Sequence, residues 1–285
     1  MSDTAQQLRV DRSSPQVWRV TFDHPPLNLV DPDTIGELDE LVTALETDPD
    51  VRVVVFDSAD PDYFLAHYDV VRDSAETTSM PNGRSGMHPW LDVTTRLSRA
   101  PVVSIAAIRG RARGAGSEFV LACDLRFASR ELAILGQPEV SVALVPGGGP
   151  MARLPQLVGR GRALEILLGG QDVDGELAER YGYVNRALPD GQLDAFVDAL
   201  AARIGSFDKQ ALAETKHYVD QVSLPDDTLL PPALEAFWAS AARSAAQTRL
   251  GALLEHGFQQ RSDVELRLAH HIGQLQPTGR AEQGS

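Results

Sequence analysis

Residues 101–128 read PVVSIAAIRGRARGAGSEFVLACDLRFA, and this stretch decides the fold class. Residues 101–108 form a continuous apolar run, which is typical of a strand that is covered on both faces. A turn of small and basic residues is expected at 109–114, then a helix at about 115–121 and a strand near 125–128. Strands that alternate with helices in this way indicate an α/β architecture.

The chain before this stretch continues the same alternation. Residues 17–22 alternate apolar and polar positions like a half-buried strand, and residues 51–56 form a second apolar strand. Between them, residues 33–45 carry apolar side chains at helical spacing, with Asp33 as the expected N-cap. Residues 72–89 are rich in Ser, Thr, Gly and Pro and lack periodicity, so they are predicted to form a mobile surface loop.

The chain after residue 147 is predicted to be mainly helical. The spacing of its apolar residues indicates helices at 163–168, 175–181, 193–204, 209–222, 231–256 and 262–272. This change of character divides the chain into a strand-bearing core, a C-terminal helical region and a flexible tail, which are residues 1–206, 207–273 and 274–285.

Composition excludes several classes of function. The 285 residues are 43% hydrophobic, enough to bury one large core, and no apolar run reaches the ~18 residues that a spanning helix needs. A formal net charge of -14 argues against nucleic-acid binding, because no basic stripe is present to displace counterions. The single cysteine excludes an internal disulfide, and the start of the chain shows no secretory signal. We therefore expect a cytoplasmic protein that binds neither nucleic acid nor membrane.

Two glutamates stand in stretches that otherwise resemble an apolar core. Glu118 ends the run GAGSE at 114–118, and Glu139 ends the run GQPE at 136–139, ahead of a glycine cluster at 147–149. Two carboxylates that converge on one apolar pocket titrate in separate steps, so one group can donate a proton while the other accepts one. This pair predicts proton chemistry next to a carbonyl group.

Four segments of the chain lie in a diagnostic order. They are YFLAHYD at 63–69, the stretch 101–128, residues 136–149, and residues 162–189 with the runs LLGGQ and YVNR. Together they resemble the crotonase superfamily, the enoyl-CoA hydratase/isomerase family. The resemblance implies a spiral of ββα units, a C-terminal helical region that forms a homotrimer or a dimer of trimers, and chemistry on an acyl thioester of coenzyme A.

The resemblance also implies a role for individual residues. The backbone N–H groups of Tyr68 and Ala115 match an oxyanion hole that binds the thioester oxygen as it gains enolate charge. Glu118 matches the residue that takes a proton from water, and Glu139 matches the one that protonates the α-carbon. The presence of both favours hydration of a 2-enoyl thioester. The positions that match substrate-binding residues are Ala66, His67, Gly114, Pro138 and Gly147. No metal and no separate cofactor is expected, since coenzyme A would enter as part of the substrate.

Two departures from the family pattern keep other functions open. His67 stands where the family has a glycine, and AHHIGQ at 269–274 replaces a basic, aromatic run that often helps bind the CoA phosphates. These departures favour another reaction of the superfamily, either double-bond isomerisation or carbon–carbon bond hydrolysis of a non-CoA diketone. A third alternative is a non-catalytic family member that serves in assembly or binding. His67 itself either packs within its loop or borders the ligand pocket as an additional proton donor.

Other conspicuous residues are assigned structural roles. Cys123 lies in an apolar run and is expected to be buried and inert. The glycines at 147–149 lack the Lys-Ser/Thr continuation of a phosphate loop. His270 and His271 are adjacent and therefore point in different directions on a helix, so no metal site is predicted. The arginines at 109, 111 and 113 are interpreted as a solvated basic turn.

Overall fold

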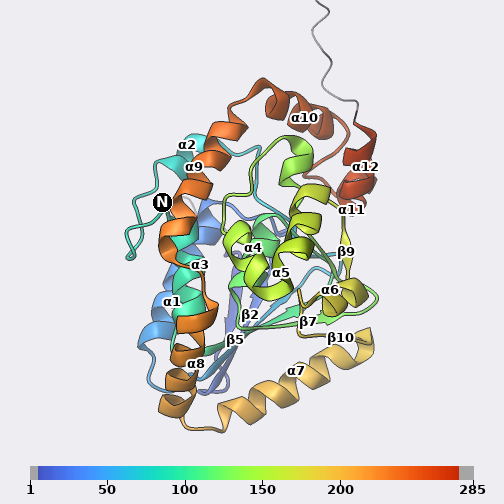
Figure 1. Ribbon diagram of the computed structural model, residues 1–285. Coiled ribbons are helices and arrows are strands. Elements are labelled where there is room, and N and C mark those ends of the chain that lie inside the picture. The colour runs from blue at the N-terminus through green and yellow to red at the C-terminus, as the bar shows by residue number, and fades with distance from the viewer. Residues whose placement is uncertain (1–5, 276–285) are drawn as a thin grey trace, which may run out of the picture.

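Two β-sheets and the helices around them make up the fold, which the computed structural model describes for residues 6–275 (Figure 1). The larger sheet has the strand order β1 (Leu8–Asp11), β2 (Val17–Phe22), β3 (Val53–Ser58), β5 (Val103–Ile108), β7 (Leu125–Ser129) and β10 (Arg186–Leu188). The smaller sheet has the order β4 (Tyr63–Leu65), β6 (Arg111–Arg113), β8 (Ile134–Gly136) and β9 (Val173–Asp174). Pairing is parallel except for β1 with β2 and β8 with β9. The predicted α/β architecture is confirmed.

Three consecutive ββα units build the centre of both sheets. They are β3–β4 with α3 (Pro89–Arg99), β5–β6 with α4 (Ala115–Ala122), and β7–β8 with α5 (Pro150–Gly169). In each unit the first strand joins the larger sheet and the second joins the smaller sheet. The chain therefore passes from one sheet to the other as it advances, which is the spiral that the resemblance implies.

The second strand of each unit was not predicted from the sequence. β4, β6 and β8 have three residues each, too few to show an alternating pattern. β6 falls inside residues 109–114, which were predicted to form a turn. That prediction is wrong, because parallel pairing with β4 on one side and β8 on the other holds Arg111–Arg113 in a strand.

The core fills both faces of the larger sheet. On one face α7 (Asp190–Gly205) contacts β2, β3, β5 and β7, and its buried Leu193 and Val197 pack there. On the other face lie α1 (Pro32–Thr47), α3 and α4 (Figure 1). The Phe119 ring of α4 makes edge-on contacts with Phe22 and Phe56, with centroids 5.3 Å and 4.9 Å apart. Because Phe119 is anchored in this way, α4 and the neighbouring Glu118 are fixed relative to the sheet.

The start of α1 differs from the prediction by two residues. Asp31, not Asp33, is the N-cap, because its carboxylate accepts a hydrogen bond from the Thr34 N–H at 2.8 Å. Pro32 then takes the first helical position, where its missing N–H costs nothing.

The segments predicted as a loop and as two long helices are subdivided. Residues 72–89 contain the short helix α2 (Ser74–Thr78). The predicted helix 231–256 consists of α9 (Leu230–Ala241) and α10 (Ser244–Glu255), and the predicted helix 262–272 consists of α11 (Asp263–Leu266) and α12 (Leu268–Gln274). The predictions of α6 (Gly175–Tyr181) and of α8 (Lys209–Ser223, predicted as 209–222) agree with the structure within one residue.

The C-terminal helices pack in two different ways. α8 has no buried residue. By contrast, α10 and α12 cover the 3-10 helix η1 (Glu139–Val142), and buried Val142 and Leu144 join their apolar side chains in one cluster. The predicted tail lies, from residue 276 onward, outside the described residues. Among residues 6–275, none of the helices is both long and apolar enough to span a membrane.

Candidate active site

Close contact between α4 and the smaller sheet sets the position of the candidate site. A Cβ atom on Gly116 would lie 2.0 Å from the carbonyl oxygen of Leu65, so only glycine allows this approach. Gly114 precedes α4 with φ of 48°, a conformation that favours glycine, and its N–H donates to the Gly136 carbonyl at 3.0 Å. The first turn of α4 is thereby held between β4 and β8.

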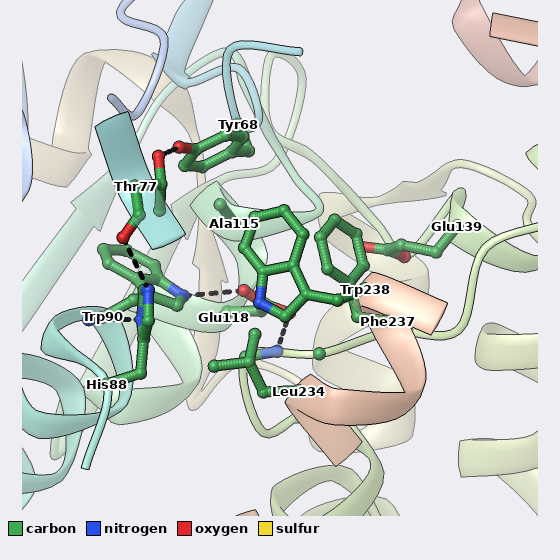
Figure 2. A pocket seen from close by; sticks show the side chains of 12 residues that line it. Tyr68, Thr77, His88, Trp90, Ala115, Glu118, Glu139, Leu234, Phe237 and Trp238 are labelled. Carbon is green, nitrogen blue, oxygen red and sulfur yellow. Dashed lines mark hydrogen bonds between the residues drawn. The ribbon is translucent and has the colours of Figure 1, made fainter. Parts of the chain in front are cut away.

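Glu118 is buried on α4 and both of its carboxylate oxygens accept hydrogen bonds. The indole Nε1–H of Trp90 donates to Oε2 at 2.8 Å, and the backbone N–H of Gly148 donates to Oε1 at 2.7 Å (Figure 2). A Cβ atom on Gly148 would lie 1.9 Å from Oε2. Glycine at this position therefore lets the backbone approach the carboxylate.

Glu139 opens η1 and is also buried, with 9% of its surface exposed. The amide of Gln137 lies between Ser117 and Glu139. With its oxygen accepting from Ser117 Oγ at 2.8 Å, its nitrogen donates to the two Glu139 oxygens at 3.1 and 3.0 Å. Tyr183 extends this network through a hydrogen bond between its hydroxyl and Ser117 Oγ.

Burial and the charge of the neighbouring group shift the pKa values of the two carboxyl groups. Burial, together with the charge of Glu118, raises the pKa of Glu139 to about 8. Burial also raises the pKa of Glu118, but the hydrogen bonds from Trp90 and Gly148 and the charge of Arg153 act in the opposite direction. Near neutral pH Glu139 therefore keeps its proton. We assign the role of base to Glu118, because the donors Trp90 and Gly148 and the charge of Arg153 favour its ionised form.

A narrow pocket lies between the two glutamates and α9. Its free space is about 60 Å³, enough for a few water molecules. The indole of Trp90 and the side chains that α9 contributes form an apolar wall around Glu118 (Figure 2). The residues that line the pocket are Tyr68, Thr77, His88, Trp90, Ala115, Glu118, Glu139, Gly147, Gly148, Leu234, Phe237 and Trp238.

Five of the nine predicted site residues line this pocket: Tyr68, Ala115, Glu118, Glu139 and Gly147. Among residues 6–275, neither the Tyr68 N–H nor the Ala115 N–H donates a hydrogen bond. A Cβ atom on Gly147 would lie 2.7 Å from the Phe237 Cβ, so this glycine lets α9 close over the pocket.

The other four predicted residues stand behind the pocket wall. Ala66, Gly114 and Pro138 are not among the lining residues. Gly114 separates two side chains, since a Cβ atom there would lie 3.1 Å from Glu139 Oε1 and 3.5 Å from the Cβ of His67. The structure does not bring the His67 ring into the pocket. The ring is buried, stacks on Phe258 with centroids 4.5 Å apart, and contacts Glu265. Packing within the protein, one of the two expected alternatives for His67, is what the structure shows.

Seven lining residues were not among the predicted site residues: Thr77, His88, Trp90, Gly148, Leu234, Phe237 and Trp238. His88, the N-cap of α3, lies inside the segment predicted to be a mobile loop, and Trp90 follows directly after that segment. The helix α9 begins more than 80 residues after Gly148, and neither Trp90 nor Trp238 stands in a motif that marks a site. Only the fold brings these segments to Glu118.

The remaining polar residues have structural partners. The arginines at 109 and 113 pair with Asp190 and Asp172, and Arg113 is fully buried, so the solvated interpretation is wrong for it. Cys123 is buried and burial raises the pKa of its thiol, as expected of an inert cysteine. Within residues 6–275, no group of three or more His, Cys, Asp or Glu side chains is arranged to hold a metal ion.

Comparison with known proteins gives a consistent result. The profile of the enoyl-CoA hydratase/isomerase family matches residues 12–245. The chain is 30% identical over 248 residues to the short-chain-enoyl-CoA hydratase of Clostridium acetobutylicum, which covers 85% of this chain and 94% of that protein.

Solved structures agree with the sequence comparison. A crystal structure of a candidate enoyl-CoA hydratase from Streptomyces avermitilis is 42% identical, covers 95% of this chain and 98% of its own, and superposes with a TM-score of 0.91. The enoyl-CoA hydratase of Bacillus anthracis is 27% identical with a TM-score of 0.69, and covers 88% of this chain and 96% of its own.

Replacement of Glu139 tests the buried carboxyl pair through stability. The folded-state pKa of about 8 exceeds the ordinary 4.5, so the folded protein binds the extra proton and its stability falls as pH rises through this window. We expect Glu139→Gln to raise the melting temperature at about pH 9 by roughly 5 °C relative to the parent protein, since 1 kcal/mol corresponds to about 2–4 °C in a large domain. At about pH 5 the two proteins should melt within about 1–2 °C of each other.

The matched control is Glu176→Gln, which removes an exposed carboxylate of α6. Thermal melts monitored by circular dichroism over this pH range provide the measurement. If Glu139→Gln has no larger effect at high pH than at low pH, Glu139 is not held protonated by the pocket.

Proposed function

The chain belongs to the enoyl-CoA hydratase/isomerase family, and on that premise we propose that it is a lyase that adds water across the double bond of a 2-enoyl thioester. It is an enzyme of the hydratase/isomerase type. The observation that carries the proposal is the pair Glu118 and Glu139, both buried on one small pocket that raises the pKa of each. Hydration needs one group to take a proton from water and another to deliver one to carbon.

In the proposed reaction a water molecule lies between the two carboxyl groups. Glu118 accepts a proton from the water as its oxygen bonds to the β-carbon of the enoyl group. The electrons of the double bond move toward the thioester carbonyl, which becomes an enolate. The carboxylic acid of Glu139 then protonates the α-carbon, and the enolate returns to a thioester carbonyl. The product is a 3-hydroxyacyl thioester, and a proton must pass from Glu118 back to Glu139 before the next turnover.

The enolate is the species that the backbone donors stabilise in this proposal. Tyr68 and Ala115 line the pocket, and their N–H groups donate to no atom of residues 6–275. Ala115 is the first residue of α4, so the positive end of the helix dipole supports its N–H. Two such donors directed at the thioester oxygen would lower the barrier to enolate formation, and loss of one commonly costs about 3 kcal/mol.

The pocket supports a short acyl group as the substrate. Its free space is about 60 Å³, and Leu234, Phe237 and Trp238 of α9 form part of its apolar wall. A relative in Clostridium acetobutylicum is a short-chain-enoyl-CoA hydratase, and we propose that this chain likewise takes a coenzyme A thioester of a short 2-enoic acid. We propose no metal and no cofactor beyond the coenzyme A of the substrate, because the carboxyl pair and the backbone donors supply each proton and charge that the reaction needs.

The position of His67 weakens the case for a non-CoA diketone as the substrate. That alternative rested in part on the replacement of the family's glycine by His67, whose ring lies outside the pocket. Double-bond isomerisation uses the same acid–base pair and therefore belongs in the same assay as hydration.

Replacing each carboxyl group by an amide tests the proposed reaction. Glu118→Gln and Glu139→Gln should each lower kcat for hydration of a crotonyl thioester by at least about 100-fold, because general acid–base groups contribute roughly 10²–10⁴. Loss of the enoyl absorbance measures hydration, and a 3-enoyl thioester assayed in parallel measures isomerisation. In the parent protein the rate should fall above about pH 8, where Glu139 loses its proton.

Glu176→Gln serves as the control and should retain the parent rate, because Glu176 lies on exposed α6. Hydration at the parent rate in either active-site variant would rule out the two-carboxylate mechanism. Isomerisation without hydration in the parent protein would transfer the proposal to an isomerase.

Trp238 offers a test of the proposed chain length. Trp238→Ala removes the indole that α9 places in the pocket, so a longer acyl chain should fit. The ratio of kcat/KM for a longer straight-chain enoyl thioester to that for the crotonyl thioester should rise about 10-fold or more, since one methylene in an apolar pocket changes specificity by roughly 10–200-fold. Trp238→Phe is the matched control and should change the ratio much less. An unchanged ratio in Trp238→Ala would show that this wall does not limit the acyl group.

We also propose that α8 mediates assembly into a trimer or a dimer of trimers. Lys216 anchors one face of α8 to the core through Asp124 and the Val102 carbonyl. Three apolar or aromatic residues of α8, Tyr218, Val219 and Val222, are exposed, and Val222 is 85% exposed. Adjacent apolar residues of this size are costly to leave in water.

The double variant Val219→Glu with Val222→Glu tests the assembly. It should reduce the mass measured by light scattering from that of a trimer or hexamer to that of a monomer, because buried unpaired carboxylates oppose association. Leu132→Glu changes an exposed apolar residue between β7 and β8 and should leave the mass unchanged. A parent protein that is monomeric at micromolar concentration would refute the proposal.

A further inference from the structure

His67 connects the candidate oxyanion hole to the end of the chain. Its ring is buried between the loop after β4 and α11. Ring atom Nδ1 lies 2.9 Å from the carbonyl oxygen of Tyr68, and Nε2 lies 2.9 Å from Oε1 of Glu265. Glu265 is fully buried, and its other oxygen accepts from the Gln259 N–H at 2.9 Å.

The partners of the His67 ring define its protonation state. The Tyr68 carbonyl can only accept a hydrogen bond, so Nδ1 must carry a hydrogen. An ionised Glu265 also only accepts, so Nε2 must carry one as well, and the ring is an imidazolium paired with a carboxylate. Burial acts to lower the pKa of His67, but the Glu265 carboxylate raises it above its ordinary value, and the pKa of Glu265 is lowered in return. Arg113, whose charge acts to lower the pKa of His67, is itself paired with Asp172.

Two further contacts join the same parts of the chain. The Phe258 ring stacks on His67 with an interplanar angle of 19°. The Gln259 side chain accepts from the Val70 N–H at 3.2 Å and donates to Asp69 Oδ1 at 3.0 Å. Residues 67–70 are thus attached to residues 258–265 by an ion pair, a ring stack and two hydrogen bonds.

Tyr68 lies in the middle of this attachment. The residues on either side of it are tied to Val30, whose N–H donates to the His67 carbonyl and whose carbonyl accepts from Asp69. Tyr68 lines the pocket; its carbonyl is held by the His67 ring, and its N–H donates no hydrogen bond to residues 6–275. Val30 on one side and the imidazolium on the other therefore restrict rotation of the peptide groups that orient this N–H.

We propose that His67 and Glu265 are positioning residues that hold the Tyr68 N–H toward the thioester oxygen. The inference rests on the proposed function, since it assigns a purpose to the donor of that same site. Neither side chain touches the substrate. Glu265 fixes the imidazolium, and the imidazolium fixes the Tyr68 peptide, so that the donor meets the developing enolate without reorganisation. The family's glycine at this position would leave the backbone flexible. His67 instead restricts the backbone, because its side chain is paired with Glu265 of α11.

Substitutions on both sides of the ion pair test the positioning role in the full-length protein. His67→Ala and Glu265→Ala should each lower kcat for hydration by about 10-fold to 100-fold, less than the 10²–10³ expected for loss of an oxyanion donor. KM should change little, because the ground-state contacts of the thioester remain. Glu265→Gln should lose much less than Glu265→Ala, since a neutral amide keeps a hydrogen bond at about half the strength. The double variant His67→Ala with Glu265→Ala should lose no more than the worse single variant, as expected of residues that act as one unit.

A spectroscopic measurement separates positioning from general destabilisation. Acetoacetyl-CoA, a 3-ketoacyl thioester, ionises to an enolate that absorbs in the near ultraviolet, and an intact oxyanion hole should increase the enolate fraction of the bound ligand. The bound-state enolate absorbance should fall in His67→Ala and Glu265→Ala. The control Arg19→Met breaks the Arg19–Asp57 ion pair on the larger sheet, away from the pocket, and should preserve both kcat and the absorbance despite some loss of stability.

Each outcome decides between the proposals. Folded His67→Ala and Glu265→Ala variants with the parent kcat and enolate absorbance would overturn the positioning role and leave the hydratase proposal intact. A fall in kcat with an unchanged enolate absorbance would also overturn it, because the defect would lie elsewhere. A parent protein that neither hydrates enoyl thioesters nor enolises the bound ligand would overturn the proposed function and this inference together.

Discussion

Two carboxyl groups buried on one small apolar pocket are the constraint on which the rest of the site depends. An ionised carboxylate in such a place is unstable unless hydrogen bonds replace its water shell. The protein supplies them unequally: Glu118 receives the Trp90 indole and the Gly148 N–H, whereas Glu139 has the Gln137 amide and keeps its proton. The unequal environments make one group a base and the other an acid at the same pH. The reactive state therefore costs folding free energy, which the two cores of the larger sheet must offset.

Close backbone approach is what permits this arrangement, and glycine supplies it in three places. Gly116 lets α4 contact the Leu65 carbonyl, Gly148 lets the backbone reach Glu118, and Gly147 makes room for Phe237 of α9. None of these contacts could accommodate a Cβ atom without movement of backbone or of a packed side chain. The Gly-Ala-Gly run at 114–116 and the glycines at 147–149 therefore act together to form the site. The first run positions the Glu118 carboxylate. The second supplies the Gly148 N–H as a donor to Glu118 and lets Phe237 of α9 pack beside it.

The sequence predicted those features that leave a local pattern. The strands β2, β3, β5 and β7, the helix α4 and both glutamates were found because apolar runs, helical spacing and the motifs around Glu118 and Glu139 are contiguous. The edge strands β1 and β10 of the larger sheet were not predicted, because they have only four and three residues. The strands of the smaller sheet were missed because three residues carry no period, and α1 was displaced because Asp31 and Asp33 are equally good caps by composition. His67 shows the limit of position-based inference. Its place in the motif suggested the pocket, but its ring turns toward Glu265, a partner 198 residues away that no local pattern reveals.

The region after residue 206 differs from the core in its secondary structure, yet the site cannot be assembled without it. Leu234, Phe237 and Trp238 close the pocket, and Phe258, Gln259 and Glu265 hold the loop that carries Tyr68. These two groups reach the same site from opposite directions, the first over Gly147 and Gly148 and the second behind His67. Between them, α10 packs on η1, the 3-10 helix that begins with Glu139. The boundary near residue 207 therefore separates two kinds of sequence. The chemistry depends on both, because C-terminal segments close the pocket at Gly147, pack on η1 and hold the loop that carries Tyr68.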